Sequence, residues 1–585
     1  MLVLALLVGQ AGCGGESATA PDAVRIVPLA RQAYLAPAAT AQDGPSAASD
    51  ASDAPSAAAA DPLALADGVR ADVAPEIGLW PAGTGVASGA GAGGSPAEAK
   101  AQVIQSARGG TAMTCVFFNM RQAPCSDADF RQAVARLVDR EAVAKASDVT
   151  VVPSQSFVPP LSDAWLEPDA TAPDLDRQAA RQHLATARSK DGAALERALH
   201  ILSPDRDVSP AAWRTAELLA EEMNGMGLNA VHVAVPDALL AKMTMARRMY
   251  DLYVADVTLA PSPFGLHALF LGSQDVPWTS AYAGVHDDAL DEALTRLWSG
   301  SDRETARQGA LDAQKRLAAL LPCVPVCTRP ERLLASSALG GFVNRPGDGA
   351  DNLWTWCGLR WADAGKGNAE AVMVATTALS DLNPLTADTA DEWRVLRMIG
   401  LPLLDLDPVT LEPVPVLAKS WDIGEWTGSD GEPRTRITFT LRRDAAWQDG
   451  KRFTASDVVF MIETVKRLPE TNFHALANAV DSAEATRDDT VTVYFKDRGY
   501  RRLFDMAWFT LLPAHLWASV DDPMAYRPWE TPNPEREGLT CLVGTGAWRI
   551  QADGIPAAGL SEGLRLNRSA PFHTSTFGRL VRERK

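Results

Sequence analysis

The chain has 585 residues, of which 46% are hydrophobic and 22% are charged, close to the averages for soluble globular proteins. Acidic residues outnumber basic ones and give a formal net charge of −18. This charge argues against nucleic acid as a partner, because phosphate binding needs a basic surface. The composition also argues against collagen, a coiled coil, a disordered chain and a protein with many membrane spans.

The N-terminal residues predict export. Residues 1–8 (MLVLALLV) form an apolar stretch that is too short to span a bilayer and is followed by small residues, as in a secretory signal. The sequence Ala11-Gly12-Cys13 resembles the lipobox of bacterial lipoproteins, in which the cysteine is lipid-modified and becomes the new N-terminus. We predict that residues 1–21 are a lipoprotein-type signal and tether and that Cys13 is lipidated. The alternative is a buried strand with an incidental cysteine.

Beyond Cys13 the chain has an even number of cysteines, which suits an oxidising compartment but does not reveal their pairing. They are Cys115, Cys125, Cys323, Cys327, Cys357 and Cys541. The segment from Cys323 to Cys327 contains a proline and predicts a strand, which would hold the two α-carbons about 13 Å apart. A disulfide tolerates no more than about 7 Å, so these two are not expected to pair with each other. With no second close pair and no nearby histidine, no metal site is predicted.

Residues 37–60 and 82–95 are low in complexity and predict loops or linkers. From about residue 110, hydrophobic periodicity predicts strands that alternate with helices, which is typical of an α/β lobe. The predicted helices are residues 127–144 (capped by Ser126), 173–186, 210–226 (stopped by Gly227), 287–298 and 303–320, and the predicted strands are 116–119, 198–202, 230–235 and 252–257.

The second half has a different pattern. Residues 436–441 (RITFTL) and 490–495 (TVTVYF) alternate apolar and polar side chains, as half-buried strands do. Residues 454–467 between them predict a helix, and residues 548–550 and 564–566 predict the two strands of a hairpin.

Segments of the second half closely resemble family 5 of the extracellular solute-binding proteins, the oligopeptide, dipeptide and nickel receptors of ABC importers. They are LEPVPVLAKSW (411–421), ITFTLRRDAAWQDG (437–450), FTASDVVF (453–460), LPAH (512–515), GTGAWR (544–549) and LRLN (564–567). Segments of the first half resemble the part of the family that normally follows the GTGAW-like motif. They are 118–119, 127–133, 139–140, 218–227, 250–252 and 287–320, while 24–27 and 65–72 resemble the family's middle.

The order of these segments resembles a circular permutation, with the family's middle and end first and its beginning last, joined near residues 358–370. Permutation is tolerable because domain termini usually lie at the surface and often close together. The rival account is a truncated tandem or a gene-model fusion, in which two halves do not complete each other.

The resemblance implies an α/β, periplasmic-binding-protein-like two-lobed fold (type II) with an extra subdomain and its segments in permuted order. Lobe I would combine residues 22–105 with their low-complexity loops, 341–415 and 500–585. Lobe II would be residues 106–340, and the smaller subdomain residues 416–499.

The resemblance also implies a cleft that closes on a ligand without covalent chemistry. We therefore expect an extracytoplasmic solute-binding lipoprotein that delivers a peptide or other small solute to an ABC importer. It would be a monomer without cofactor or metal, held by its lipid at the outer face of the cell membrane or in the periplasm, with an ABC permease as partner and no nucleic acid. The alternative is a degenerate, signalling or scaffold member of the same fold that does not feed a transporter.

Peptide-binding members of the family anchor the ligand's amino terminus with an aspartate in a Trp-x-Ala-Asp-Tyr-like segment. The corresponding residues 257–262 (VTLAPS) have Val257 in place of the tryptophan and Ala260 in place of the aspartate. A buried ammonium without a carboxylate partner is costly, so the class of ligand stays open.

The predicted ligand-binding residues combine this segment with aromatic and polar residues after it and near the family's start. They are Asp256, Thr258, Ser262, Phe264, Trp278, Asn383 and Trp393. The aromatic residues could instead belong to the core, and Asn383, which precedes a proline, could be a turn residue. Residues 559–563 (GLSEG) match G-x-S-x-G but lie in a loop that leads into a strand, so no enzyme is predicted.

Overall fold

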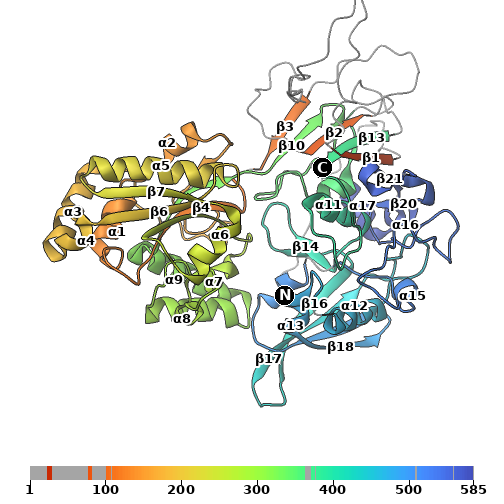
Figure 1. Ribbon diagram of the computed structural model, residues 1–585. Coiled ribbons are helices and arrows are strands. Elements are labelled where there is room, and N and C mark those ends of the chain that lie inside the picture. The colour runs from red at the N-terminus through yellow and green to blue at the C-terminus, as the bar shows by residue number, and fades with distance from the viewer. Residues whose placement is uncertain are drawn as a thin grey trace, which may run out of the picture.

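The computed structural model describes residues 23–28, 77–81, 101–106, 108–362, 370–375, 377–468, 470–507, 510–557 and 559–583. Cys13 and the low-complexity ranges 37–60 and 82–95 lie outside the described residues. Two α/β lobes stand side by side, and a smaller sheet with its own helices lies below lobe I, the right-hand lobe of Figure 1. The predicted α/β class and two-lobed arrangement are thereby confirmed.

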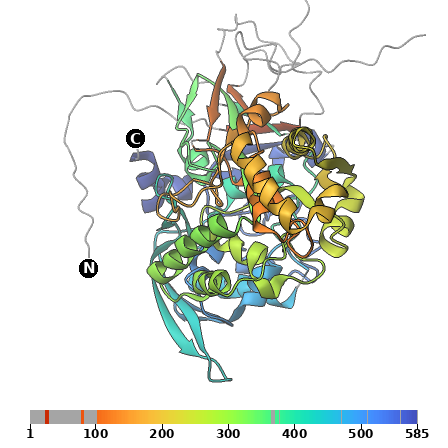
Figure 2. The same ribbon diagram turned by 90° about the vertical axis from the view of Figure 1, so that its left-hand side faces the viewer.

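Lobe II, on the left of Figure 1, is built around a six-stranded sheet in the order β5-β9-β4-β8-β6-β7. Its strands are β4 (Ala112–Phe118), β5 (Val152–Pro153), β6 (Ala198–Pro204), β7 (Asn229–Val235), β8 (Leu252–Thr258) and β9 (Cys323–Arg329). Its helices are α1 (Ala128–Ala135), α2 (Arg140–Ala146), α3 (Arg177–Lys190), α4 (Gly192–Glu196), α5 (Pro210–Gly225), α6 (Asp237–Ala241), α7 (Leu266–Phe270), α8 (Asp288–Ser299) and α9 (Arg303–Leu320). Figure 2 shows these helices from the side of lobe II.

Most predicted elements of lobe II are present, but the helix predicted over residues 127–144 is wrong because two helices occupy this range. The first is capped by Asp127 rather than Ser126: the carboxylate of Asp127 accepts a hydrogen bond from the Phe130 N–H at 3.1 Å. The carboxylate of Asp139 accepts from the Ala142 N–H at 2.9 Å and starts α2. A side-chain cap competes with continuation of the preceding helix, so the first helix ends before Asp139 and a second one begins there.

Helix α5 ends as predicted, because Gly227 follows it with a φ of +79°. Glycine has no Cβ and adopts this left-handed conformation at little cost, which makes it a common helix stop.

The central sheet of lobe I collects strands from the whole length of the chain. Its order is β20-β21-β1-β13-β2-β10-β3. The strands are β1 (Ala23–Pro28), β2 (Ile77–Pro81), β3 (Ala101–Gln105), β10 (Arg332–Ser336), β13 (Glu370–Ala375), β20 (Trp548–Ile550) and β21 (Leu564–Arg568). The predicted hairpin is present, since β20 pairs antiparallel with β21. Strand β10 pairs with β2 and β3, although its residues fall in the range predicted for lobe II.

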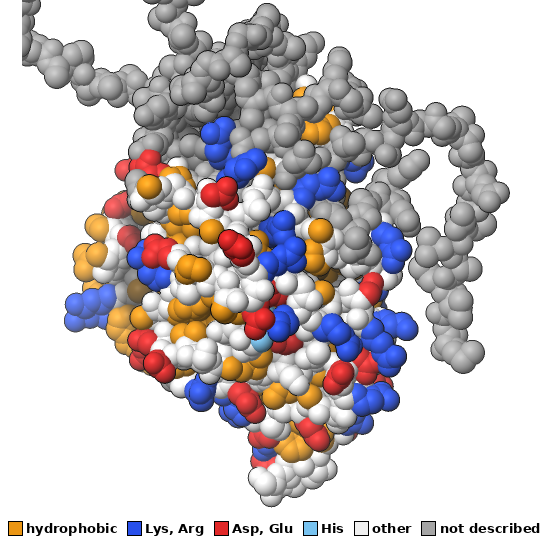
Figure 3. Space-filling view, turned by 90° about the vertical axis from the view of Figure 1, so that its right-hand side faces the viewer, with side chains coloured by type: hydrophobic (Ala, Val, Ile, Leu, Met, Phe, Trp, Pro, Cys, Tyr) orange, Lys and Arg blue, Asp and Glu red, His pale blue; other side chains and the backbone are white. Residues whose placement is uncertain are grey.

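Helices and short strands complete lobe I. They are α10 (Leu353–Gly358), α11 (Ala390–Ile399), α14 (Arg502–Asp505), α15 (Ala514–Trp517), α16 (Ala570–Thr574), α17 (Thr576–Glu583), the pair β11 (Leu339–Gly340) and β12 (Arg360–Trp361), and the pair β14 (Leu404–Leu406) and β15 (Pro413–Pro415). On the face of the molecule in Figure 3, basic side chains are interspersed with acidic ones.

The smaller subdomain is an antiparallel sheet in the order β16-β17-β19-β18, packed against α12 (Ala455–Arg467). Its strands are β16 (Ala418–Thr427), β17 (Pro433–Leu441), β18 (Val480–Arg487) and β19 (Thr490–Phe495), and α13 (His474–Ala479) precedes β18. In β17 the side chains of Ile437, Phe439 and Leu441 are buried while their neighbours are half-buried, as the alternating sequence predicts.

The six cysteines of the described residues are buried free thiols. Cys323 and Cys327 both lie on β9, which confirms the predicted strand. Burial raises the pKa of the Cys327 thiol to about 12. Within the described ranges no helix is long and apolar enough to cross a membrane, and no group of His, Cys, Asp and Glu is arranged to hold a metal ion.

Candidate functional site

A cavity of about 910 Å³ lies where the two lobes and the smaller subdomain meet. Lobe II contributes Trp298 at the end of α8, and lobe I contributes residues of α11 and of the segments around it. The subdomain contributes α13 and the residues before it. The lining is mixed: aromatic rings (Trp298, Trp393, Phe473), amides (Asn352, Asn472, Asn478), arginines (Arg345, Arg397, Arg501, Arg502) and aspartates (Asp351, Asp388, Asp405, Asp497, Asp505).

Helix α11 brings Trp393 to this cavity. Its start is fixed by a capping box, in which the Thr389 hydroxyl accepts from the Glu392 N–H and the Glu392 carboxylate accepts from the Thr389 N–H. Val395, Leu396 and neighbours bury the inner face of the helix, and Trp393 is half-buried on the cavity side. Its ring meets that of Phe473 edge to face, with centroids 6.0 Å apart at 88°.

A buried ion pair forms another wall of the cavity. A guanidinium nitrogen of Arg345 lies 3.0 Å from a carboxylate oxygen of Asp405, and the two side chains are only 3% and 5% exposed. Arg345 also pairs with Asp348. Burial raises the pKa of the Asp405 carboxyl above its ordinary value, although the charge of Arg345 acts in the opposite direction. This wall of the cavity is therefore stabilised by an ion pair that is buried away from solvent.

Arg501 links this cavity to lobe II. Its guanidinium carbon lies 3.7 Å from the centre of the Trp298 ring, and its Nε donates to the Trp298 carbonyl at 3.2 Å. His267 stacks on the same ring, with centroids 4.3 Å apart. Burial and the charge of Arg501 lower the pKa of His267 to about 4, so the imidazole is neutral at pH 7. Arg501 and Arg502 are balanced by Asp497, to which each donates at 2.5 Å.

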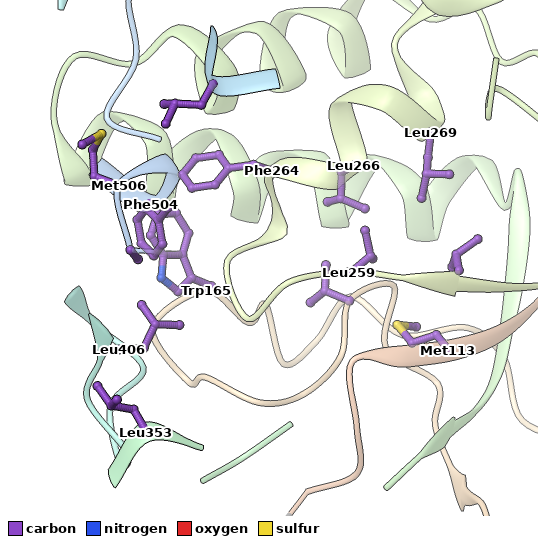
Figure 4. Close-up of a cluster of buried hydrophobic side chains, with 14 of the residues drawn as sticks. Met113, Trp165, Leu259, Phe264, Leu266, Leu269, Leu353, Leu406, Phe504 and Met506 are labelled. Atoms are coloured by element: carbon purple, nitrogen blue, oxygen red, sulfur yellow. The ribbon is translucent and has the colours of Figure 1, made fainter. Parts of the chain in front are cut away.

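The lobes also meet through an apolar cluster and one ion pair. Phe264 of lobe II lies edge to face with Trp165 of lobe II at 5.6 Å and with Phe504 of lobe I at 5.5 Å (Figure 4). Arg303, at the start of α9, donates to both carboxylate oxygens of Glu412 at 2.9 and 2.5 Å. These contacts hold the two lobes against each other beside the cavity.

Two sequence motifs meet behind α11 and set the position of its end. Gln448 of the WQDG segment is fully buried, and its Nε2 donates to the carbonyls of Trp548 at 2.6 Å and of Ile399, the last residue of α11, at 3.0 Å. The Gln448 Oε1 accepts from the Gly544 N–H at 3.0 Å. The Gly546 N–H donates to the Ile399 carbonyl at 2.7 Å. The WQDG and GTGAW motifs therefore hold the helix that carries Trp393.

Of the seven predicted ligand residues, Trp393 lines this cavity. Phe264 lies in the apolar cluster between the lobes and is 8% exposed. Asn383 is buried: its Nδ2 donates to the carbonyls of Pro523 and Tyr526 at 2.8 and 3.0 Å, and its Oδ1 accepts from the Leu385 N–H. This is the turn role that the Asn-Pro sequence allows.

The other four lie on lobe II. The Asp256 carboxylate accepts from the hydroxyls of Thr114 at 2.7 Å and Ser209 at 2.6 Å, which joins β8 to β4 and to the start of α5. Thr258 is exposed at the end of β8, and Ser262 is buried before the turn Pro263–Gly265. Trp278 is 63% exposed, and its backbone N–H donates to the Met245 carbonyl. None of the four belongs to the described lining of the cavity.

Several lining residues were not among the predicted ligand residues, including Asp388, Phe473, Trp298 and Arg501. They come from segments that are far apart in the chain, and each segment taken alone has the pattern of a helix end or a loop. The one available signal was that Asp388 precedes Trp393, a predicted ligand residue near the family's start, by five residues.

A sequence profile of the bacterial extracellular solute-binding proteins, family 5 (middle), matches residues 82–276 and 412–553, together more than half of the chain. Two curated proteins match shorter stretches. The uncharacterized protein y4wM of Sinorhizobium fredii is 32% identical over 114 residues, 19% of this chain and 16% of that protein. A probable peptide-binding protein, YejA, of Agrobacterium fabrum is 31% identical over 118 residues, 20% of this chain and 18% of that protein.

Two solved structures are similar at low identity. HbpA2 of Haemophilus parasuis is 20% identical with a TM-score of 0.39 and covers 45% of this chain and 50% of that one. The oligopeptide-binding protein AppA of Bacillus subtilis, in complex with a nonapeptide, is 17% identical with a TM-score of 0.35 and covers 41% of this chain and 49% of that one. Because the family profile matches more than half of its residues, the chain belongs to family 5 of the bacterial extracellular solute-binding proteins.

Proposed function

We propose that this protein binds a peptide or another small polar solute in the cavity between its lobes and delivers it to an ABC importer. The observation that carries the proposal is the cavity of about 910 Å³, which falls within the size range of small-molecule sites. Its aromatic rings offer apolar contact, and its amides, arginines and aspartates offer partners of both charges for a zwitterionic molecule. Binding and release of a solute involve no covalent chemistry and therefore require no catalytic residues.

Binding can be tested by thermal shift with a panel of short peptides, amino acids, sugars and metal chelates. A solute present at 100 times its Kd stabilises the native state by about 2.7 kcal/mol and raises Tm. Trp393→Ala should weaken binding about tenfold or more, because it removes a half-buried aromatic wall of the cavity.

Trp278→Ala provides the matched comparison, since Trp278 is exposed and lies outside the described lining of the cavity. If Trp278→Ala lowers the affinity and Trp393→Ala does not, the solute is bound on lobe II and the proposed site is wrong. If no solute of a broad panel stabilises the protein, the alternative of a degenerate, signalling or scaffold member is favoured.

We further propose that the protein is exported and tethered through a lipid on Cys13. In the native host the protein should partition into the detergent phase of a Triton X-114 extract, and Cys13→Ser should move it to the aqueous phase. Ser17→Ala, a change in the same segment, should leave the partition unchanged. Aqueous partition of the unchanged protein would contradict the lipid tether.

A further inference from the structure

One carboxylate on the cavity wall has no ion-pair or hydrogen-bond partner among the described residues. Of the five aspartates that line the cavity, four form ion pairs within the protein: Asp351 with Arg394, Asp405 with Arg345, Asp497 with Arg501, and Asp505 with Arg502. The exposed carboxylate of Asp388 makes no ion pair and no hydrogen bond with the part of the chain that the structure describes. It is therefore the acidic group of this wall that a ligand can use.

Asp388 precedes α11, but its carboxylate is not needed to cap this helix. A residue near a helix N-terminus often serves as a cap, but here Thr389 is the N-cap. The Glu392 carboxylate accepts from the N–H groups of Asp388 at 3.2 Å and Thr389 at 3.1 Å. The start of the helix is thus satisfied by two other side chains, and the Asp388 backbone is held in place while its carboxylate is free to face the cavity.

An aromatic pair lines the same cavity as Asp388. The Asn472 Nδ2 donates to the carbonyl of Ala387, the residue before Asp388, at 2.6 Å, and the Asn472 N–H donates to the Leu385 carbonyl at 3.0 Å. These bonds tie the segment of Asp388 to that of Phe473, whose ring meets the Trp393 ring edge to face. Asp388 and the two aromatic residues thus come from adjoining segments of two parts of the molecule and line one cavity.

We propose that Asp388, Trp393 and Phe473 form a subsite for a cationic group of the ligand, an ammonium or a guanidinium. The inference rests on the proposed function and adds the ligand class, a solute that carries a positive charge. A carboxylate supplies a charge-assisted hydrogen bond, and aromatic faces attract a cation through their quadrupoles. Both interactions gain strength where the ligand and the cavity wall exclude water.

The test uses pairs of probes that differ in one charge: free-amine dipeptides and their N-acetylated forms, and diamines and their mono-acetylated forms. Binding to the full chain is measured by titration calorimetry. The unchanged protein should bind the cationic member of a pair at least about tenfold more tightly. Asp388→Asn should reduce affinity for the cationic member about tenfold or more and leave the acetylated member almost unaffected.

Asp553→Asn is the matched control, because Asp553 is exposed and lies outside the described lining of the cavity. It should change neither affinity. Phe473→Leu should weaken binding of the cationic member more than that of the acetylated one. Equal binding of both members, or unchanged binding by Asp388→Asn, would overturn this subsite while the proposed function stands. If no probe and no solute of the wider panel binds, the proposed function and this subsite fail together.

Discussion

Replacing Arg345 with methionine should lower the free energy of unfolding by about 3 to 5 kcal/mol, because it strands a buried carboxylate. Arg345 and Asp405 are almost fully removed from water and lie 3.0 Å apart. Methionine fills much of the same space but cannot neutralise Asp405. Urea titration followed by tryptophan fluorescence measures the loss.

The loss from Arg345→Met should depend on pH in a defined direction. Asp405 already has a raised pKa in the folded protein, and the charge of Arg345 opposes that rise. Without Arg345 the folded pKa rises further, so the folded state binds the Asp405 proton more tightly than the unfolded state does. A carboxyl whose pKa is higher in the folded than in the unfolded state destabilises the protein at pH values above the folded pKa. Below the ordinary aspartate pKa this effect disappears, because the carboxyl is protonated in both states. The destabilisation should therefore be greatest near pH 7 to 8 and shrink as the pH falls toward 4.

Two variants make this result specific. Arg345→Met combined with Asp405→Asn should regain much of the lost stability, because the amide carries no charge and its oxygen can still accept from the Leu406 N–H. Arg108→Met removes a similar contact to Asp163, but those side chains are 48% and 78% exposed. That loss should be no more than about 1 kcal/mol. Equal losses from Arg345→Met and Arg108→Met would contradict the role of burial.

The regular elements of this chain were predictable because each carries its own pattern. In β17 and β19 the alternation of apolar and polar residues places one face in the core, and the amphipathic sequences of α8 and α9 do the same for helices. The break between α1 and α2 was missed because periodicity continues through it. Only the geometry of Asp139 shows that this side chain caps a new helix.

The cavity could not be predicted in the same way. Whether an aspartate is free or paired depends on arginines that approach from other segments: Arg345 reaches Asp405 across 60 positions of sequence, and Arg394 reaches Asp351 across 43. Trp393 was predicted because the family resemblance pointed to its segment, while Phe473 comes from the smaller subdomain. The site is formed only when the two lobes and the smaller subdomain pack together, so no single segment of the sequence reveals it.

The sheet of lobe I bears on the predicted order of the family segments. It joins β1 and β2 from the start of the chain with β20 and β21 from its end, so one sheet needs both halves. Two halves that complete one sheet agree better with a permuted single protein than with two incomplete copies. The permuted order itself stays a prediction.

Replacing Gly544 with alanine should destabilise the protein by about 3 kcal/mol, the upper end of the usual range for overpacking. A Cβ at this position would lie 2.2 Å from the Ile399 carbonyl oxygen and 2.6 Å from its carbon, and backbone atoms cannot rotate away as a side chain does. The change should also weaken solute binding, because Ile399 ends the helix that carries Trp393. Urea titration and calorimetry on one preparation measure both effects.

The control for Gly544→Ala is Gly225→Ala, at the last position of α5, where an added Cβ meets no atom of the described residues within 4 Å. Alanine favours helix over glycine by roughly 0.5 to 1 kcal/mol, so this variant should be as stable as the unchanged protein or slightly more so. If Gly544→Ala unfolds at the same urea concentration as Gly225→Ala, the close approach of the GTGAW segment to α11 is not required. If it loses stability but binds solute normally, the segment supports the fold without positioning Trp393.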